Sequence, residues 1–191
     1  MTPQRTGVIA GVALASAALV WLLFFGLPRW YGSPATSAAA AAAPSAPAAA
    51  GRKIKARLFY VGDDGARLVS VERDVPFGEG TAQQAKEIIG AQIAPAAEPL
   101  VSAVPPGTSL RAVFVTEKGD AYVDLSREAS AAHPGGSLNE LLTVYTIVNA
   151  LTANLPAVTA VQLLIDGKQV ETLAGHVDLR RPLEKNLAWV Q

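Results

Sequence analysis

The segment AYVDLSREASAAHPGGSLNELL, residues 121–142, decides how the second half of this chain is interpreted. It combines an acid, two hydroxyls and an imidazole, carried by Asp124, Ser126, Ser137 and His133, with a pair of glycines. These are the components of a compact hydrolase site. They are also residues that end a strand and begin a helix. The elements on either side distinguish between the two interpretations.

The end of this segment has the pattern of a helix start. Ser137-Leu-Asn-Glu140 matches the S-x-x-E capping box, in which the serine accepts from a first-turn amide and the glutamate reaches back to the serine N–H. Gly135 and Gly136 allow the chain to turn into the helix, which is predicted over about residues 138–153. Two adjacent apolar stripes run along it, formed by Leu138, Leu141, Leu142, Tyr145, Val148 and Thr152 and by Val144, Ile147, Leu151 and Leu155. A face this wide predicts burial against a sheet.

A serine hydrolase needs a hydroxyl, a base that activates it and donors for the oxyanion. The candidates are Ser126 or Ser137 with His133, and His176 is the only other imidazole. Neither serine lies in a G-x-S-x-G or S-x-x-K motif. Asp124 and Ser126 follow a predicted strand, where short side chains accept from nearby backbone N–H groups. We therefore expect no catalytic residues and no enzyme activity, with a cell-envelope hydrolase as the alternative. His133 alone has no structural role that the sequence assigns.

No cofactor or metal site is predicted. The PGGS stretch, residues 134–137, resembles an anion-binding helix start, but Glu140 competes for the same donors and no lysine follows the glycines. The acidic turns GDDG (62–65) and KGD (118–120) are typical of solvated turns more than of calcium sites. His176 is expected to have a backbone partner. The remaining possible metal ligands lack the short paired spacing of a zinc motif: His133, His176, Asp124 and Asp178.

The first strands of the chain are predicted as a hairpin with one wet face. KIKARLFYV, residues 53–61, alternates basic and apolar side chains, and RLVSVERDV, residues 67–75, returns after the GDDG turn. We expect acidic residues of the second strand to pair with basic residues of the first. The charged residues of this face are Lys53, Lys55, Arg57, Glu72 and Asp74.

The other elements repeat this arrangement. A T-x-x-Q capping box at Thr81–Gln84 starts a helix that Pro95 and Pro99 end. Hairpins are predicted at 109–117 with 121–125, and at 160–173 through Asp166-Gly167. The tail, residues 174–191, is expected to be partly irregular, with Pro182 as a breaker. The predicted order is ββα-ββα-ββ, an α+β fold with two helices packed on one face of a mixed or antiparallel sheet.

The N-terminal region predicts a membrane anchor. GVIAGVALASAALVWLLFFGL, residues 7–27, has no charge and no proline and is long enough to cross a bilayer as a helix. A cleaved signal peptide is the alternative, but its apolar region is usually about 7–15 residues. The positive charge before residue 7 predicts that residues 1–6 stay in the cytoplasm. Residues 28–51, rich in Ala, Pro and Ser, are a linker, and 52–191 form one globular domain.

Composition excludes several function classes. The chain has a formal net charge of zero, and all of its acidic residues follow the linker, so the globular part is slightly acidic. A nucleic-acid binder would need a basic face, and none is expected here. The absence of cysteine excludes disulfides, a thiol nucleophile and thiolate metal sites.

Four stretches together resemble the GerMN domain family of sporulation and spore-germination proteins: ARLFYV, PPGTSLRAVFVTEKGDAYVDLS, GGSLNELLTVYTIVNALTANLPAV and VQLLIDGKQVETLAGHVDL. The resemblance covers roughly residues 53–179 in a single copy. It implies a small α/β domain outside the cytoplasmic membrane with no established catalytic residues. It also implies interaction or oligomerisation, because the family fold is similar to ring-building domains. Familiar sporulation members differ in having two copies and a lipobox cysteine.

The combined expectation is a single-pass protein of the cytoplasmic membrane with an extracytoplasmic, periplasmic-side GerMN-like domain. Its function would be non-catalytic interaction or assembly in the bacterial envelope, related to sporulation or germination. The expected partners are other envelope proteins, a second copy or the cell wall, and the charged first hairpin is the first surface to test. No nucleic acid is expected among them.

Overall fold

The computed structural model describes residues 51–191. The predicted cytoplasmic N-terminus, the anchor and all but the last residue of the linker lie outside these residues. Within residues 51–191, none of the helices combines the length and the apolar character that a membrane crossing requires. The domain that follows is described by itself.

The first two strands form a hairpin, as predicted. β1 (Lys53–Val61) and β2 (Leu68–Pro76) are antiparallel, with Lys55 opposite Asp74 and Arg57 opposite Glu72. The turn between them is closed by Asp64, whose Oδ1 accepts hydrogen bonds from the N–H groups of Ala66 and Arg67 at 2.9 and 3.2 Å. The two strands form a separate two-stranded sheet.

The second sheet is mixed. Its strands are β3 (Leu110–Val115), β4 (Asp120–Leu125), β5 (Ala160–Ile165), β6 (Lys168–Gln169) and β7 (Leu183–Glu184), in the order β3-β4-β5-β6 with β7 also on β5. β4 and β5 are parallel, and the other pairs are antiparallel. The predicted hairpins are confirmed, and the Asp166-Gly167 turn has positive φ at both residues, 50° and 75°. β7 lies in the tail that was expected to be partly irregular.

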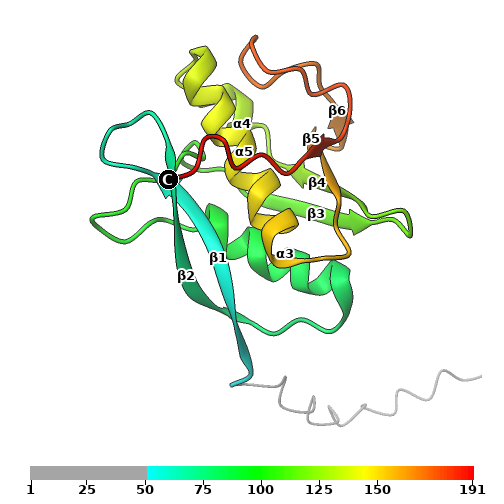
Figure 1. Ribbon diagram of the computed structural model, residues 1–191. Coiled ribbons are helices and arrows are strands. Elements are labelled where there is room, and N and C mark those ends of the chain that lie inside the picture. The colour runs from blue at the N-terminus through cyan, green and yellow to red at the C-terminus, as the bar shows by residue number, and fades with distance from the viewer. Residues whose placement is uncertain (1–50) are drawn as a thin grey trace, which may run out of the picture. The chain divides into compact units, whose positions relative to one another are not determined.

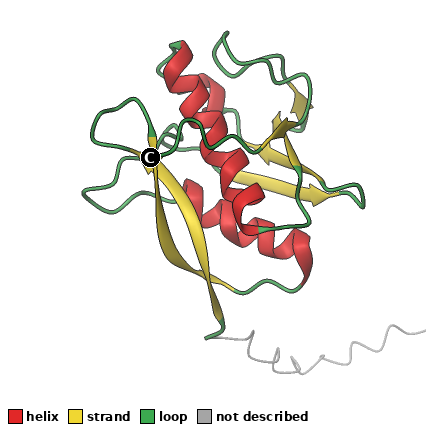
Figure 2. Cartoon of the chain, in the orientation of Figure 1, coloured by secondary structure: helices red, strands yellow, loops and turns green. Residues whose placement is uncertain are grey.

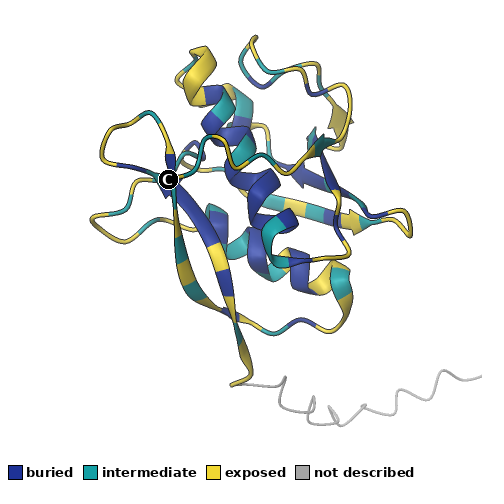
Figure 3. Cartoon of the chain, viewed as in Figure 1, coloured by how far each residue is buried: buried dark blue, intermediate teal, exposed yellow. Residues whose placement is uncertain are grey.

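Two long helices lie between the sheets (Figures 1 and 2). α3 (Gly80–Ile93) contacts β1, β2 and β3, while α5 (Ser137–Asn154) contacts both β1 and β5. A short helix, α4 (Glu128–Ala131), precedes α5. The α+β class is confirmed, but the prediction of a single sheet is wrong, because β1 and β2 form a sheet of their own. The wide apolar face of α5 is buried on both sides because it packs against two sheets (Figure 3).

The predicted capping box of α3 is also wrong. The helix begins at Gly80 after Glu79, and no side chain caps it. Gln84 has another role: its Oε1 accepts from Gly78 N at 2.9 Å and its Nε2 donates to Pro76 O at 3.0 Å. A buried amide with two backbone partners outside the helix is better satisfied than one that reaches back for a single solvated N–H.

The edge of β1 that faces away from β2 is bound by side-chain amides from both helices. Gln92 accepts from Phe59 N and donates to Phe59 O, both at 2.8 Å. Asn154 does the same at Arg57, at 2.8 and 2.7 Å. Val61 N donates to Val101 O at 2.8 Å. Each amide thus replaces one residue of a neighbouring strand, and the helices are fastened to the hairpin by its backbone.

We expect Gln92→Ala to lower the free energy of unfolding by about 3 kcal/mol, because each buried group left without a partner costs about 1–3 kcal/mol. Phe59 and Gln92 are both fully buried, so water does not replace the amide. The matched control is Gln83→Ala on the exposed face of the same helix, which should change stability by less than about 0.5 kcal/mol. Urea unfolding of the full chain measures both changes in stability. Equal losses of stability in the two variants would show that the Gln92–Phe59 hydrogen bonds are unimportant.

Candidate functional site

The hydroxyls and the imidazole of the expected hydrolase alternative are not assembled into a catalytic group. Ser126 Oγ accepts a hydrogen bond from Ser109 N at 3.0 Å and so closes the end of the β3–β4 hairpin, as predicted for a residue that finishes a strand. His133 bonds neither Ser126 nor Ser137, within the part of the chain that the structure describes. The sequence therefore lists the components of a triad that the fold keeps apart.

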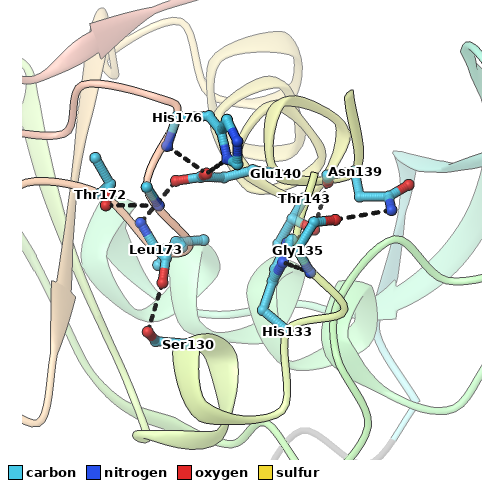
Figure 4. Close-up of polar contacts among 10 residues, drawn as sticks. Ser130, His133, Gly135, Asn139, Glu140, Thr143, Thr172, Leu173 and His176 are labelled. Atoms are coloured by element: carbon cyan, nitrogen blue, oxygen red, sulfur yellow. Dashed lines mark hydrogen bonds and ion pairs between the residues drawn. The ribbon is translucent and has the colours of Figure 1, made fainter. Parts of the chain in front are cut away.

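His133 has a structural role in the loop before α5 (Figure 4). Its Nδ1 accepts from Gly135 N at 3.0 Å, which places the ring proton on Nε2. Nε2 then donates to Thr143 Oγ1 at 3.1 Å, and that hydroxyl donates to Ala103 O at 2.6 Å. The imidazole joins the loop, the helix and the segment before β3. Burial of the ring lowers the pKa of His133, although the charge of Glu140 acts in the opposite direction.

The predicted capping box of α5 is wrong. The N-cap position is occupied by Gly136, at φ 87°, and no side chain caps the helix. Gly135 also has positive φ, so the predicted turn into the helix is confirmed at both glycines. Glu140 does not reach back to Ser137, and it therefore does not compete for the first-turn amides. It points instead to the loop between β6 and β7 (Figure 4).

The Glu140 carboxylate is fully buried and holds that loop on α5. Oε1 accepts from Leu173 N at 2.8 Å, and Oε2 accepts from His176 N at 2.8 Å. Burial alone would raise the pKa of Glu140, but hydrogen bonds from backbone N–H groups outweigh it and lower the pKa below its ordinary value. These donors belong to Ala174, His176, Leu173 and Val177. The hydrogen bonds from Leu173 N and His176 N satisfy a buried carboxylate better than the one amide of a capping box.

His176 is a partner of the same carboxylate. Its Nδ1 lies 3.2 Å from Glu140 Oε2, and its side chain is 44% exposed. The expectation of a backbone partner for this ring is wrong. A carboxylate that orients an imidazole supplies two of the three members of a triad, and a hydroxyl would be the third. The Thr172 hydroxyl of the same loop instead accepts a hydrogen bond from Gly175 N at 2.9 Å. The arrangement fixes the loop and presents no activated hydroxyl among the described residues.

The expected metal candidates are also separated. Asp124 Oδ1 accepts from Gly167 N at 2.7 Å, and its Oδ2 accepts from Arg111 Nε at 3.1 Å. Asp178 is paired with Arg180 Nη2 at 2.9 Å, and this side-chain hydrogen bond contributes most to lowering the pKa of Asp178. Residues 51–191 contain no group of three or more side chains placed to hold a metal ion.

The charged face of the first hairpin is exposed. Lys55 Nζ forms an ion pair with Asp74 Oδ1 at 2.6 Å, and their hydrogen bond raises the pKa of Lys55 and lowers the pKa of Asp74. Arg57 lies opposite Glu72 but forms no ion pair with it, so only one of the two expected pairs is present. All five charged residues of the face are exposed: Lys53, Lys55, Arg57, Glu72 and Asp74.

The family is shown by comparison with known proteins. The family model Germane, described as sporulation and spore germination, matches residues 57–171, which is more than half of the chain. The chain belongs to the Germane family. Its globular part is a GerMN-type domain, as the resemblance of the sequence predicted. No curated protein matches the chain.

Solved structures share the fold of this GerMN-type domain. A Clostridium perfringens protein described as a lipoprotein is 21% identical, with a TM-score of 0.50 over 70% of this chain and 88% of that chain. The tandem GerMN domains of the sporulation protein GerM from Bacillus subtilis are 20% identical, with a TM-score of 0.52 over 71% of this chain and 46% of that chain. The first GerMN domain of GerM alone is 19% identical, with a TM-score of 0.51 over 69% of this chain and 97% of that chain. At these identities the likeness concerns the fold.

We expect Glu140→Ala to lower the free energy of unfolding of the GerMN-type domain by about 3 kcal/mol, because it leaves the N–H groups of Leu173 and His176 without an acceptor. Amide hydrogen exchange at Leu173 and His176 should become faster. Glu117→Ala, at an exposed turn, is the control and should change stability by less than about 0.5 kcal/mol. Unchanged exchange in the loop would contradict the role given to the carboxylate.

The His133 imidazole predicts a pH dependence of stability. Its pKa is lowered in the folded chain, so the unfolded chain binds the proton first as pH falls through about 6.5. The free energy of unfolding should therefore decrease between about pH 7.5 and 5.5. His133→Gln should lose this contribution, while His176→Gln should keep it. Denaturant unfolding at a series of pH values tests this, and superimposable profiles of wild type and His133→Gln would disprove it.

Proposed function

We propose that this chain is a single-pass envelope protein whose GerMN-type domain acts as a non-catalytic interaction or assembly module. Residues 7–27 anchor it in the cytoplasmic membrane with residues 1–6 in the cytoplasm, and residues 28–51 tether residues 52–191 outside. Membership of the Germane family supports a sporulation or germination process. The description of a structural neighbour as a lipoprotein supports an extracytoplasmic position at a membrane.

The observation that carries the proposal is the exposed charged face of the first hairpin. Charged rows on a sheet that is firmly fastened to the domain offer a preformed surface for a partner, because little conformational entropy is lost on binding. Gln92 and Asn154 supply this fastening at β1. The partner in this proposal is another envelope protein, with a second copy or the cell wall as the alternatives.

A photo-reactive amino acid at Arg57, in the full chain and in its own envelope, tests the proposal. A defined crosslinked species, identified by mass spectrometry, is expected from this position. The matched control is Lys118, an exposed basic residue in the β3–β4 turn, which should give no such species. Crosslinks of the same yield from both positions, or none from Arg57, would contradict an interaction surface on the hairpin.

A measurement of hydrolase activity distinguishes the alternative, an envelope hydrolase, from the interaction module. If Ser126 or Ser137 acted with His133, their alanine variants would lose turnover of ester or cell-wall substrates while remaining folded. The geometry favours the interaction module, since Ser126 Oγ accepts a hydrogen bond from Ser109 N and His133 Nδ1 accepts one from Gly135 N. Turnover by the wild-type chain that these variants abolish would overturn the proposal.

A further inference from the structure

The outer edge of β2 is filled at both ends and open between them. At one end, Leu68 N donates to Trp189 O at 2.7 Å, and Gln191 N donates to Leu68 O at 2.8 Å. At the other end, Gln84 Nε2 donates to Pro76 O at 3.0 Å. Within residues 51–191, the segment Trp189–Gln191 therefore pairs with β2 at Leu68.

The open residues follow from the alternation of an antiparallel ladder. Successive residues of β2 direct their backbone groups alternately toward β1 and away from it. Leu68 and Pro76 bond partners outside the hairpin, so their backbone groups point away from β1. By the alternation, the backbone groups of Ser70, Glu72 and Asp74 also point away from β1. These three residues are exposed, and their outward N–H and C=O groups have no partner in residues 51–191. Figure 1 shows β2 at the rim of the domain.

The opposite edge of the hairpin is covered from Arg57 to Val61, and only Lys53 and Lys55, near its end, are without a backbone partner there in residues 51–191. Arg57, Phe59 and Val61 direct their backbone groups away from β2, and all three are hydrogen-bonded. Asn154 and Gln92 occupy the first two positions. A partner strand that extends the hairpin at its centre therefore has to add to β2, which makes the edge more specific than the whole charged face.

The side chains of the open segment define what would fit. Ser70, Glu72 and Asp74 lie on the exposed face, and Glu72 forms no ion pair within residues 51–191. Val69 and Val71 alternate with them and are half-buried toward the helices. A complementary strand therefore carries basic residues on one face and apolar residues on the other. β1, which already pairs with the inner edge of β2, has this pattern.

A second copy of β2 fits less well. The antiparallel register that uses all three open positions places Glu72 opposite Glu72 of the other copy. Like charges directly opposite each other in a sheet are destabilising. The acidic row therefore favours a different, basic strand over self-pairing.

We propose that Ser70–Asp74 of β2 binds an extended segment of a partner protein, with alternating basic and apolar side chains, as a third strand of the first sheet. This inference rests on the proposed interaction function and assigns the edge and the chemistry of the partner. Main-chain hydrogen bonds provide affinity, and the basic side chain opposite Glu72 provides specificity, since Asp74 is already paired with Lys55.

A labelled peptide with the β1 sequence Lys-Ile-Lys-Ala-Arg-Leu tests the proposal on the full chain by fluorescence anisotropy and amide NMR shifts. Binding is expected, with shifts concentrated at Ser70, Glu72 and Asp74. A peptide with glutamate at its three basic positions, and a peptide N-methylated at alternate residues, should each bind at least about fivefold more weakly. The N-methylated peptide tests main-chain pairing without any change to the protein.

Glu72→Lys should weaken peptide binding at least about fivefold, whereas Glu117→Lys, with the same change of charge at a remote exposed turn, should not. A thermal melt confirms that each variant is folded. Absence of binding at millimolar peptide, or equal binding by the N-methylated peptide, would overturn the proposal. Crosslinking from Arg57 that persists in Glu72→Lys, together with no peptide binding, would leave the interaction function standing and reject this edge.

Discussion

The backbone of β1 from Arg57 to Val61 is hydrogen-bonded on the side away from β2, and both long helices are arranged around these bonds. Isolated two-stranded hairpins are only marginally stable, and an unpaired buried N–H or C=O is costly. Gln92 forms these bonds at Phe59 and Asn154 forms them at Arg57. Because these amides come from different helices, the small sheet positions α3 and α5 together. The larger sheet then closes the other side of the helices.

The same device holds the C-terminal part of the chain. Asn149, fully buried in α5, donates to Asn186 O at 2.8 Å and accepts from Asn186 N at 3.0 Å. Glu140 is its charged counterpart at the start of the helix, where it accepts from Leu173 N and His176 N. In each case a helical side chain stands in for a missing backbone partner. Residues that could be read as catalytic therefore serve to attach extended segments of the chain.

Sequence reasoning predicted what depends on local pattern. The alternation of β1 and β2, the wide apolar face of α5 and the Asp166-Gly167 turn were correct because side-chain period and turn chemistry act over a few residues. The predicted capping boxes at Thr81 and Ser137 are wrong, because the polar residue three positions after each predicted cap has better partners elsewhere. A polar residue inside an apolar stripe, such as Gln92 between Ile89 and Ile93, was the available signal for a side-chain amide that bonds a strand backbone.

The sequence by itself determined the three hairpins, the two long helices, their order and the family, because periodicity, turns and a set of shared stretches are properties of neighbouring residues. Only the tertiary structure decided that the strands form two sheets, that Glu140 binds a loop 33 residues away, and that His133 bonds Thr143. A side-chain carboxylate or amide can form only a few hydrogen bonds, but it has many possible partners along the chain. The partner that it takes depends on which backbone groups the packed core leaves without water.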